Sequence, residues 1–132
     1  MNKITLLVFV FIVLCASSVR ADMYDIDKTE LECINNTSDT HIMNKCTYTA
    51  MVAWKNEIND ALLNLRSINK ENYKKIIRSQ KYWEKYKDNE FRAIDAFCSN
   101  VDGTMYKNVS TGLKKDIVKR RAIQLNEYLN LN

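Results

Sequence analysis

The chain has 132 residues, with two glycines, four cysteines and no proline, and its net charge at pH 7 is +4. A β-sandwich or β-barrel of this length needs many turns, which draw on glycine and proline. The composition therefore argues against both and favours an all-helical domain. The charge is too small to indicate nucleic-acid binding, and we expect no nucleic-acid partner.

Residues 1–21 have the pattern of a secretory leader. A positive start at Lys3 is followed by an apolar run over residues 4–16, and Val19 and Ala21 occupy the small-residue positions that signal peptidase reads. The run is shorter than the roughly 18 apolar residues that a membrane span needs. We therefore predict cleavage after Ala21, no stable membrane anchor afterwards, and a periplasmic or secreted protein.

The remaining chain is long enough for one domain with a single modest core. Its first part, residues 22–38, contains DMYDIDKTELE, which has five acidic residues and one lysine. We predict that residues 22–38 form an extended, acidic N-terminal arm and that residues 39–132 form the domain.

Apolar residues recur at helical spacing in three blocks, over residues 43–65, 73–97 and 106–128. A polar run, residues 67–72, separates the first two blocks, and SNVDGT at 99–104 separates the last two. Three helices of about 25 residues joined by short loops predict an up-down-up antiparallel three-helix bundle.

Export makes a disulfide expected, and the chain after the leader has three cysteines, Cys33, Cys46 and Cys98. Three is an odd number, so at most one bridge can form within the chain. These cysteines and the single histidine, His41, lack the close-paired spacing of a zinc site, and no nucleophile has a base beside it. We predict no metal, no cofactor and no enzymatic activity.

Short motifs follow one another in a fixed order from Cys33 to about Leu129. They are Cys33 and Cys46, Ile58-Asn59, Gln80-x-x-Trp83-x-x-Tyr86-Lys87-Asp88, Gly103-Thr104-Met105-Tyr106 and then Arg121. In this order the chain resembles the lysozyme inhibitor LprI-like family of small exported bacterial proteins. The resemblance implies an all-helical exported domain and, for the member that names the family, inhibition of lysozyme.

The resemblance also bears on the disulfide. Two further cysteines of the family pattern are missing together, because Phe91 and about Leu113 stand in their places. An apolar contact between these two residues could replace that bridge. The family's other pair implies a Cys33–Cys46 bridge here, while Cys33 with Cys98 remains an alternative, since the second helix returns to the start of the first.

The second predicted helix has polar residues on its apolar stripe. If the second and third helices reverse near residue 101, Arg121 comes level with residues 80–84, where its guanidinium can stack on Trp83 and donate hydrogen bonds. We predict a polar seam that fixes the register of the bundle, with a binding role as the alternative. Its members are Asn59, Gln80, Trp83, Asp88 and Arg121. Lys87 is expected to keep its stem on the stripe and its ammonium in water.

Charge is unevenly distributed, since KKDIVKRR at residues 114–121 has five bases and one acid. This segment and the acidic arm could attract each other or act as separate surfaces. The leading hypothesis is an exported binding protein whose protein partner is a lysozyme-type cell-wall hydrolase. The acidic arm would make the contact, through Asp25, Asp27, Glu30 and Glu32.

Two alternatives stay open. One is an envelope interaction module without inhibitory activity. The other is a binder of anionic surfaces that acts through the basic third helix, with Lys114, Lys115, Lys119 and Arg120. The sequence does not set the oligomeric state.

Overall fold

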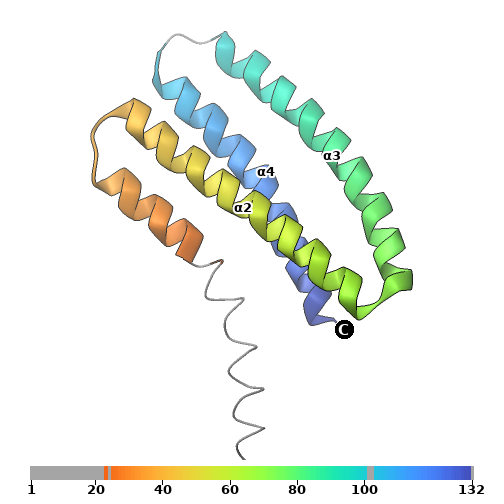
Figure 1. Ribbon diagram of the computed structural model, residues 1–132. Helices are drawn as coiled ribbons and strands as arrows, with labels where there is room; N and C mark the ends of the chain where they lie inside the picture. Colours follow the sequence, from red (N-terminus) through yellow and green to blue (C-terminus); the bar gives the residue numbers. More distant parts are fainter. Residues whose placement is uncertain (1–22, 24, 101–102, 132) are drawn as a thin grey trace, which may run out of the picture.

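The computed structural model describes residues 23, 25–100 and 103–131, so the predicted leader lies outside the described part of the chain. Within that part the chain forms four helices and no strand, which confirms the all-α class (Figure 1). The helices are an N-terminal helix that includes residues 25–35, α2 (Thr40–Ile68), α3 (Lys70–Ser99) and α4 (Met105–Asn130).

The prediction of a three-helix bundle with an extended arm is wrong in one respect, because the arm is a fourth helix. Its apolar residues Met23 and Ile26 pack against the core, and Glu30 is buried one turn further on. Positions 23, 26 and 30 have helical spacing, so they lie on one face. The N-terminal helix runs antiparallel to α2 and covers one side of it (Figure 1).

Asparagine and aspartate side chains set the starts of α2 and α3. Asp39 accepts hydrogen bonds from the backbone N–H groups of His41 and Ile42, at 2.7 and 3.3 Å. Asn69 ends α2, where its own N–H donates to the Leu65 carbonyl, and its side chain accepts from the first N–H groups of α3. A single residue therefore makes the reversal between the two helices.

The core lies mainly between α2 and α4, which run side by side in the same direction (Figure 1). Thr40 and Thr104 meet at the end where both helices begin, with their hydroxyl oxygens 3.5 Å apart. The largest almost fully buried side chains are Trp54, Val118 and Leu125. These residues come from the first and third apolar blocks of the sequence.

The α3 helix runs antiparallel to α2 and α4 and is attached more lightly. The structure describes all of α3, and only Gln80 in it is buried. Its apolar residues Tyr73, Ile76, Trp83 and Phe91 are partly buried against the core. Burial of apolar surface therefore stabilises the packing of α3 less than that of α2 and α4. The hydrogen bonds and ion pairs of α3 contribute a larger share of what holds it in the bundle.

Candidate functional site

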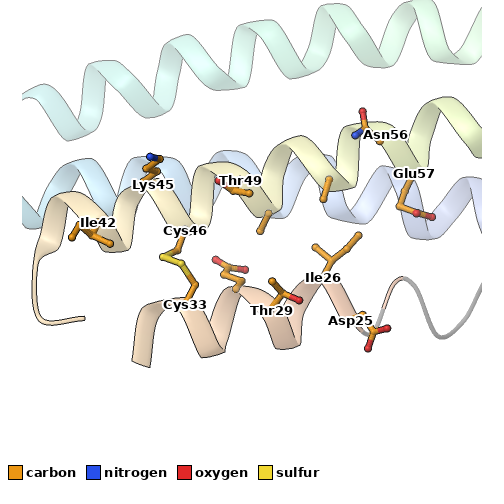
Figure 2. Close-up of a pocket in the computed structure, with 13 residues that line it drawn as sticks. Asp25, Ile26, Thr29, Cys33, Ile42, Lys45, Cys46, Thr49, Asn56 and Glu57 are labelled. Carbon is orange, nitrogen blue, oxygen red and sulfur yellow. A yellow bond between two sulfur atoms is a disulfide. The ribbon is translucent and has the colours of Figure 1, made fainter. Parts of the chain in front are cut away.

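A groove of about 640 Å³ lies between the N-terminal helix and α2 (Figure 2). Small and aliphatic side chains form much of its lining: Ile26 and Thr29 on the N-terminal helix, and Ile42, Thr49, Ala50 and Ala53 on α2. Asp25 and Glu57 lie toward one end of the groove, and Lys45 and the disulfide lie toward the other (Figure 2). The groove thus has mainly apolar walls with a few polar side chains, an exposed carboxylate at Asp25 toward one end and a lysine toward the other.

The disulfide joins Cys33 of the N-terminal helix to Cys46 of α2, with the two Cα atoms 5.8 Å apart. Cys46 is buried, whereas Cys33 is exposed. Cys98 is a free, half-buried thiol. The alternative pairing of Cys33 with Cys98 is therefore absent from the structure, and the bridge instead ties one end of the N-terminal helix to α2.

Ion pairs tie the other side of the N-terminal helix to α4. The Lys115 ammonium lies 2.8 and 3.0 Å from the two carboxylate oxygens of Glu30, which is 8% exposed, and the Lys119 ammonium pairs with Asp27. The acidic and basic segments of the sequence thus contact each other.

The four acidic residues predicted to bind a partner are divided by this arrangement. Asp27 and Glu30 bind lysines of α4, whereas Asp25 and Glu32 are exposed. Glu32 lies 4.0 Å from Lys28 on the same helix, and among the described residues no ion pair involves Asp25. Of the four, Asp25 and Glu32 are therefore the two that do not pair with α4.

A third lysine of the basic segment, Lys114, pairs with Asp95 of α3 at 2.5 Å. Asp95 also accepts a hydrogen bond from the Ser110 hydroxyl at 3.1 Å. The hydrogen bond from Lys114 is the main cause that lowers the pKa of Asp95 below its ordinary 3.8. Phe91 and Leu113 stand where the family pattern has two further cysteines. The Phe91 side chain is partly buried against the core, and its ring centre lies 5.5 Å from the Lys114 ammonium, whereas Leu113 is 47% exposed.

The polar seam is centred on Arg121, which is only 4% exposed. Its Nε donates to Gln80 Oε1 at 2.8 Å, its Nη1 donates to Gln124 Oε1 at 2.6 Å, and its guanidinium carbon lies 5.8 Å from the centre of the Trp83 ring. Burial lowers the pKa of Arg121, and the charges of neighbouring groups, among them Glu84, oppose that shift. The seam therefore holds a buried cation between α3 and α4.

Two predicted members lie outside this cluster. Asn59 follows the buried Ile58 on α2 and is exposed, because successive helical residues point about 100° apart. Asp88 is exposed and lies 3.4 Å from the Lys87 ammonium. Glu84 and Gln124 take their place in the network, since Gln80 Nε2 donates to Glu84 Oε1 at 2.9 Å. Gln124 was recognisable only by its position one turn after Arg121.

The Lys87 ammonium does not lie in water as expected. It is paired with Glu84, and the side chain is only 15% exposed. Burial alone would lower the pKa of Lys87, but the hydrogen bond to Glu84 and the charges of Glu84 and Asp88 raise the pKa above its ordinary 10.5. The ammonium also lies 5.5 Å from the centre of the Trp83 ring.

The described residues contain no group of three or more His, Cys, Asp or Glu side chains that could hold a metal ion. In the same part of the chain, none of the helices is both long and apolar enough to cross a membrane.

The described residues thus form a small helical domain with a disulfide, a groove open to solvent and an internal network of ion pairs. The family model for the lysozyme inhibitor LprI matches residues 33–125. This match covers most of the chain, so the protein belongs to the LprI lysozyme inhibitor family. Searches of curated proteins and of solved structures gave no match.

Proposed function

We propose that this protein is an exported binding protein that inhibits a lysozyme-type cell-wall hydrolase. The observation that carries the proposal is the family match over residues 33–125. The leader pattern of residues 1–21 supports export to the compartment where such hydrolases act. Such a protein would inhibit by binding to the hydrolase and keeping substrate away from it, so it needs no catalytic group of its own.

The distribution of charge supports contact through the N-terminal helix. A cationic lysozyme is repelled by exposed lysines and attracted by exposed carboxylates. Lys115 and Lys119 are already paired with acidic residues of the N-terminal helix, so the repulsion from α4 is reduced. Asp25 and Glu32 remain directed outward and supply the attraction.

Binding to anionic surfaces through α4 is less well supported. Three of the four basic residues in that hypothesis, Lys114, Lys115 and Lys119, are bound to carboxylates of the N-terminal helix or α3. The fourth, Arg120, is exposed, and its Nε donates to the Asp116 carbonyl at 3.2 Å. An anionic surface would have to compete with these internal partners for the lysines.

The test uses the chain from Asp22 onward and a panel of lysozymes of different types. Each lysozyme clears a bacterial cell-wall suspension, and the fall in turbidity is followed with increasing amounts of the protein. We expect at least one lysozyme to be inhibited in a dose-dependent, saturable way. If no lysozyme is inhibited even at a large molar excess, the inhibitory function is wrong and an envelope interaction module becomes the better assignment.

A further inference from the structure

We propose that the groove between the N-terminal helix and α2 is the docking site for the hydrolase, and that it receives an aliphatic side chain flanked by a lysine or arginine. This inference rests on the proposed function, because it names the surface through which inhibition would occur.

The lining suits an aliphatic side chain. Ala50, Ala53 and Thr49 are short side chains on the α2 side, so they leave the space that makes up the volume of about 640 Å³. Ile26 and Ile42 add aliphatic walls, and Ile42 is 46% exposed. Clefts of roughly 300 to 1,000 Å³ with mainly apolar walls and a few polar groups are typical ligand-binding sites in proteins. Filling this groove would bury apolar surface that now faces solvent.

The groove is held open by contacts on two sides of the N-terminal helix. The Cys33–Cys46 disulfide fixes one end of this helix against α2. The pairs of Glu30 with Lys115 and of Asp27 with Lys119 hold it against α4. A site that is already formed loses little conformational entropy when a partner binds, so a modest contact area can give useful affinity.

Charge selects the occupant. Asp25 is exposed at one end of the groove, and Lys45 lies toward the other end (Figure 2). Glu30, a buried carboxylate of the lining, is paired with Lys115. The exposed carboxylate of Asp25 therefore favours a lysine or arginine next to the inserted aliphatic residue. Such a segment fits a cationic protein.

The experiment fills the groove. Ala53 is half-buried and lines the groove, so Ala53→Trp should block entry. The matched control is Ala93→Trp, which makes the same change at an exposed position of α3. Dissociation constants are measured for a lysozyme that the wild-type protein inhibits. We expect Ala53→Trp to weaken binding by roughly tenfold or more, as blocking a central anchor does, and Ala93→Trp to bind like wild type.

A second measurement uses only the wild-type protein, so its result does not depend on whether a variant folds. Hydrogen exchange of the wild-type protein is compared with and without the lysozyme. We expect slower exchange in residues 25–33 and 42–57, and no change in α3. Protection confined to α3, or unchanged affinity in a folded Ala53→Trp variant, would overturn the groove assignment while the inhibitory function stands.

Two further outcomes also decide the inference. If the wild-type protein inhibits no lysozyme, the proposed function fails and the docking site falls with it. If light scattering shows a dimer that Ala53→Trp dissociates, the groove holds a second copy of the chain instead of the hydrolase. We expect the wild-type protein to remain a monomer at the concentrations used for binding.

Discussion

At the scale of single residues, Arg121 has an unusual position for a cation. Its Nε and Nη1 have glutamine partners, but its buried Nη2 has no hydrogen-bond acceptor among the described residues. A buried charge that is only partly satisfied costs folding free energy, and removing it leaves its own partners unpaired. Gln80, the only buried residue of α3, is one of those partners.

Replacing Arg121 with Ala should therefore lower the free energy of unfolding by roughly 1 to 3 kcal/mol, because Gln80 loses its donor and a cavity forms beside Trp83. The matched control is Arg120→Ala, since Arg120 is the exposed neighbour on the same helix, and it should change the free energy little. Urea unfolding measures both. Equal stability of wild type and Arg121→Ala, together with lost inhibition, would instead give Arg121 a binding role.

The ion pair between Lys114 and Asp95 should make stability depend on pH in the acid range. The pKa of Asp95 is lowered in the folded protein, so its charged form stabilises the fold above pH 3.8 and this contribution disappears as the pH falls through the lowered value. We expect the stability difference between wild type and Asp95→Asn to be present at pH 6 and to shrink below pH 3.8. Urea titrations at several pH values test this, and a difference that stays constant into the acid range would contradict it.

At the scale of helices, α2, α3 and α4 were predicted because apolar residues recur at helical spacing in each and polar turns separate them. The buried face of α4 nevertheless includes Ser110, Arg121 and Asn126. The N-terminal helix escaped prediction because its stripe includes Glu30, a charged residue that is buried only through Lys115, 85 residues further along the chain. A pattern along one segment cannot reveal a partner supplied by another. The Arg121–Gln80 contact was predictable from the sequence, because the reversal between α3 and α4 brings the two residues to the same height. The exposure of Asn59 and Asp88 was not, because it depends on how far each helix is rotated about its own axis.

The disulfide should matter most for the N-terminal helix. A bridge across 13 residues contributes on the order of 2 to 3 kcal/mol by restricting the unfolded chain. Replacing Cys33 and Cys46 together by Ser should lower the melting temperature and speed hydrogen exchange first in residues 25–35, while α2 and α4 stay protected. The control is Cys98→Ser, which removes the free thiol and should leave exchange in residues 25–35 unchanged.

Mass spectrometry of unreduced peptides checks the pairing itself. The expected result is a peptide with Cys33 linked to Cys46 and Cys98 outside that bridge. A dominant peptide linking Cys33 to Cys98 would contradict both the pairing and the tether at the end of the groove.

At the scale of the whole molecule, the opposite charges of the N-terminal helix and α4 largely cancel where the two helices meet. If the proposed function holds, we expect approach to a cationic partner to depend on carboxylates that remain outside these pairs, such as Asp25 and Glu32. Such steering acts on the association rate and weakens as salt is added.

Neutralising Asp25→Asn and Glu32→Gln together should therefore slow association with a cationic lysozyme and flatten the salt dependence of the rate. The control is Glu71→Gln with Glu127→Gln, which changes the net charge equally at exposed positions of α3 and α4 outside the groove lining. Stopped-flow or surface-based kinetics at several salt concentrations compare the two. If both pairs slow association to the same degree, net charge matters and the location of the carboxylates does not.

The disulfide and the ion pairs that hold the N-terminal helix differ greatly in the sequence separation of the residues that they join. The disulfide joins residues 13 apart, whereas the ion pairs to Lys115 and Lys119 span 85 and 92 residues. A chain that emerges with its N-terminus first has Cys46 within reach long before α4 exists. We therefore expect oxidation to link the first two helices early, so that α4 meets a prepared acidic surface and its arrival completes the fold.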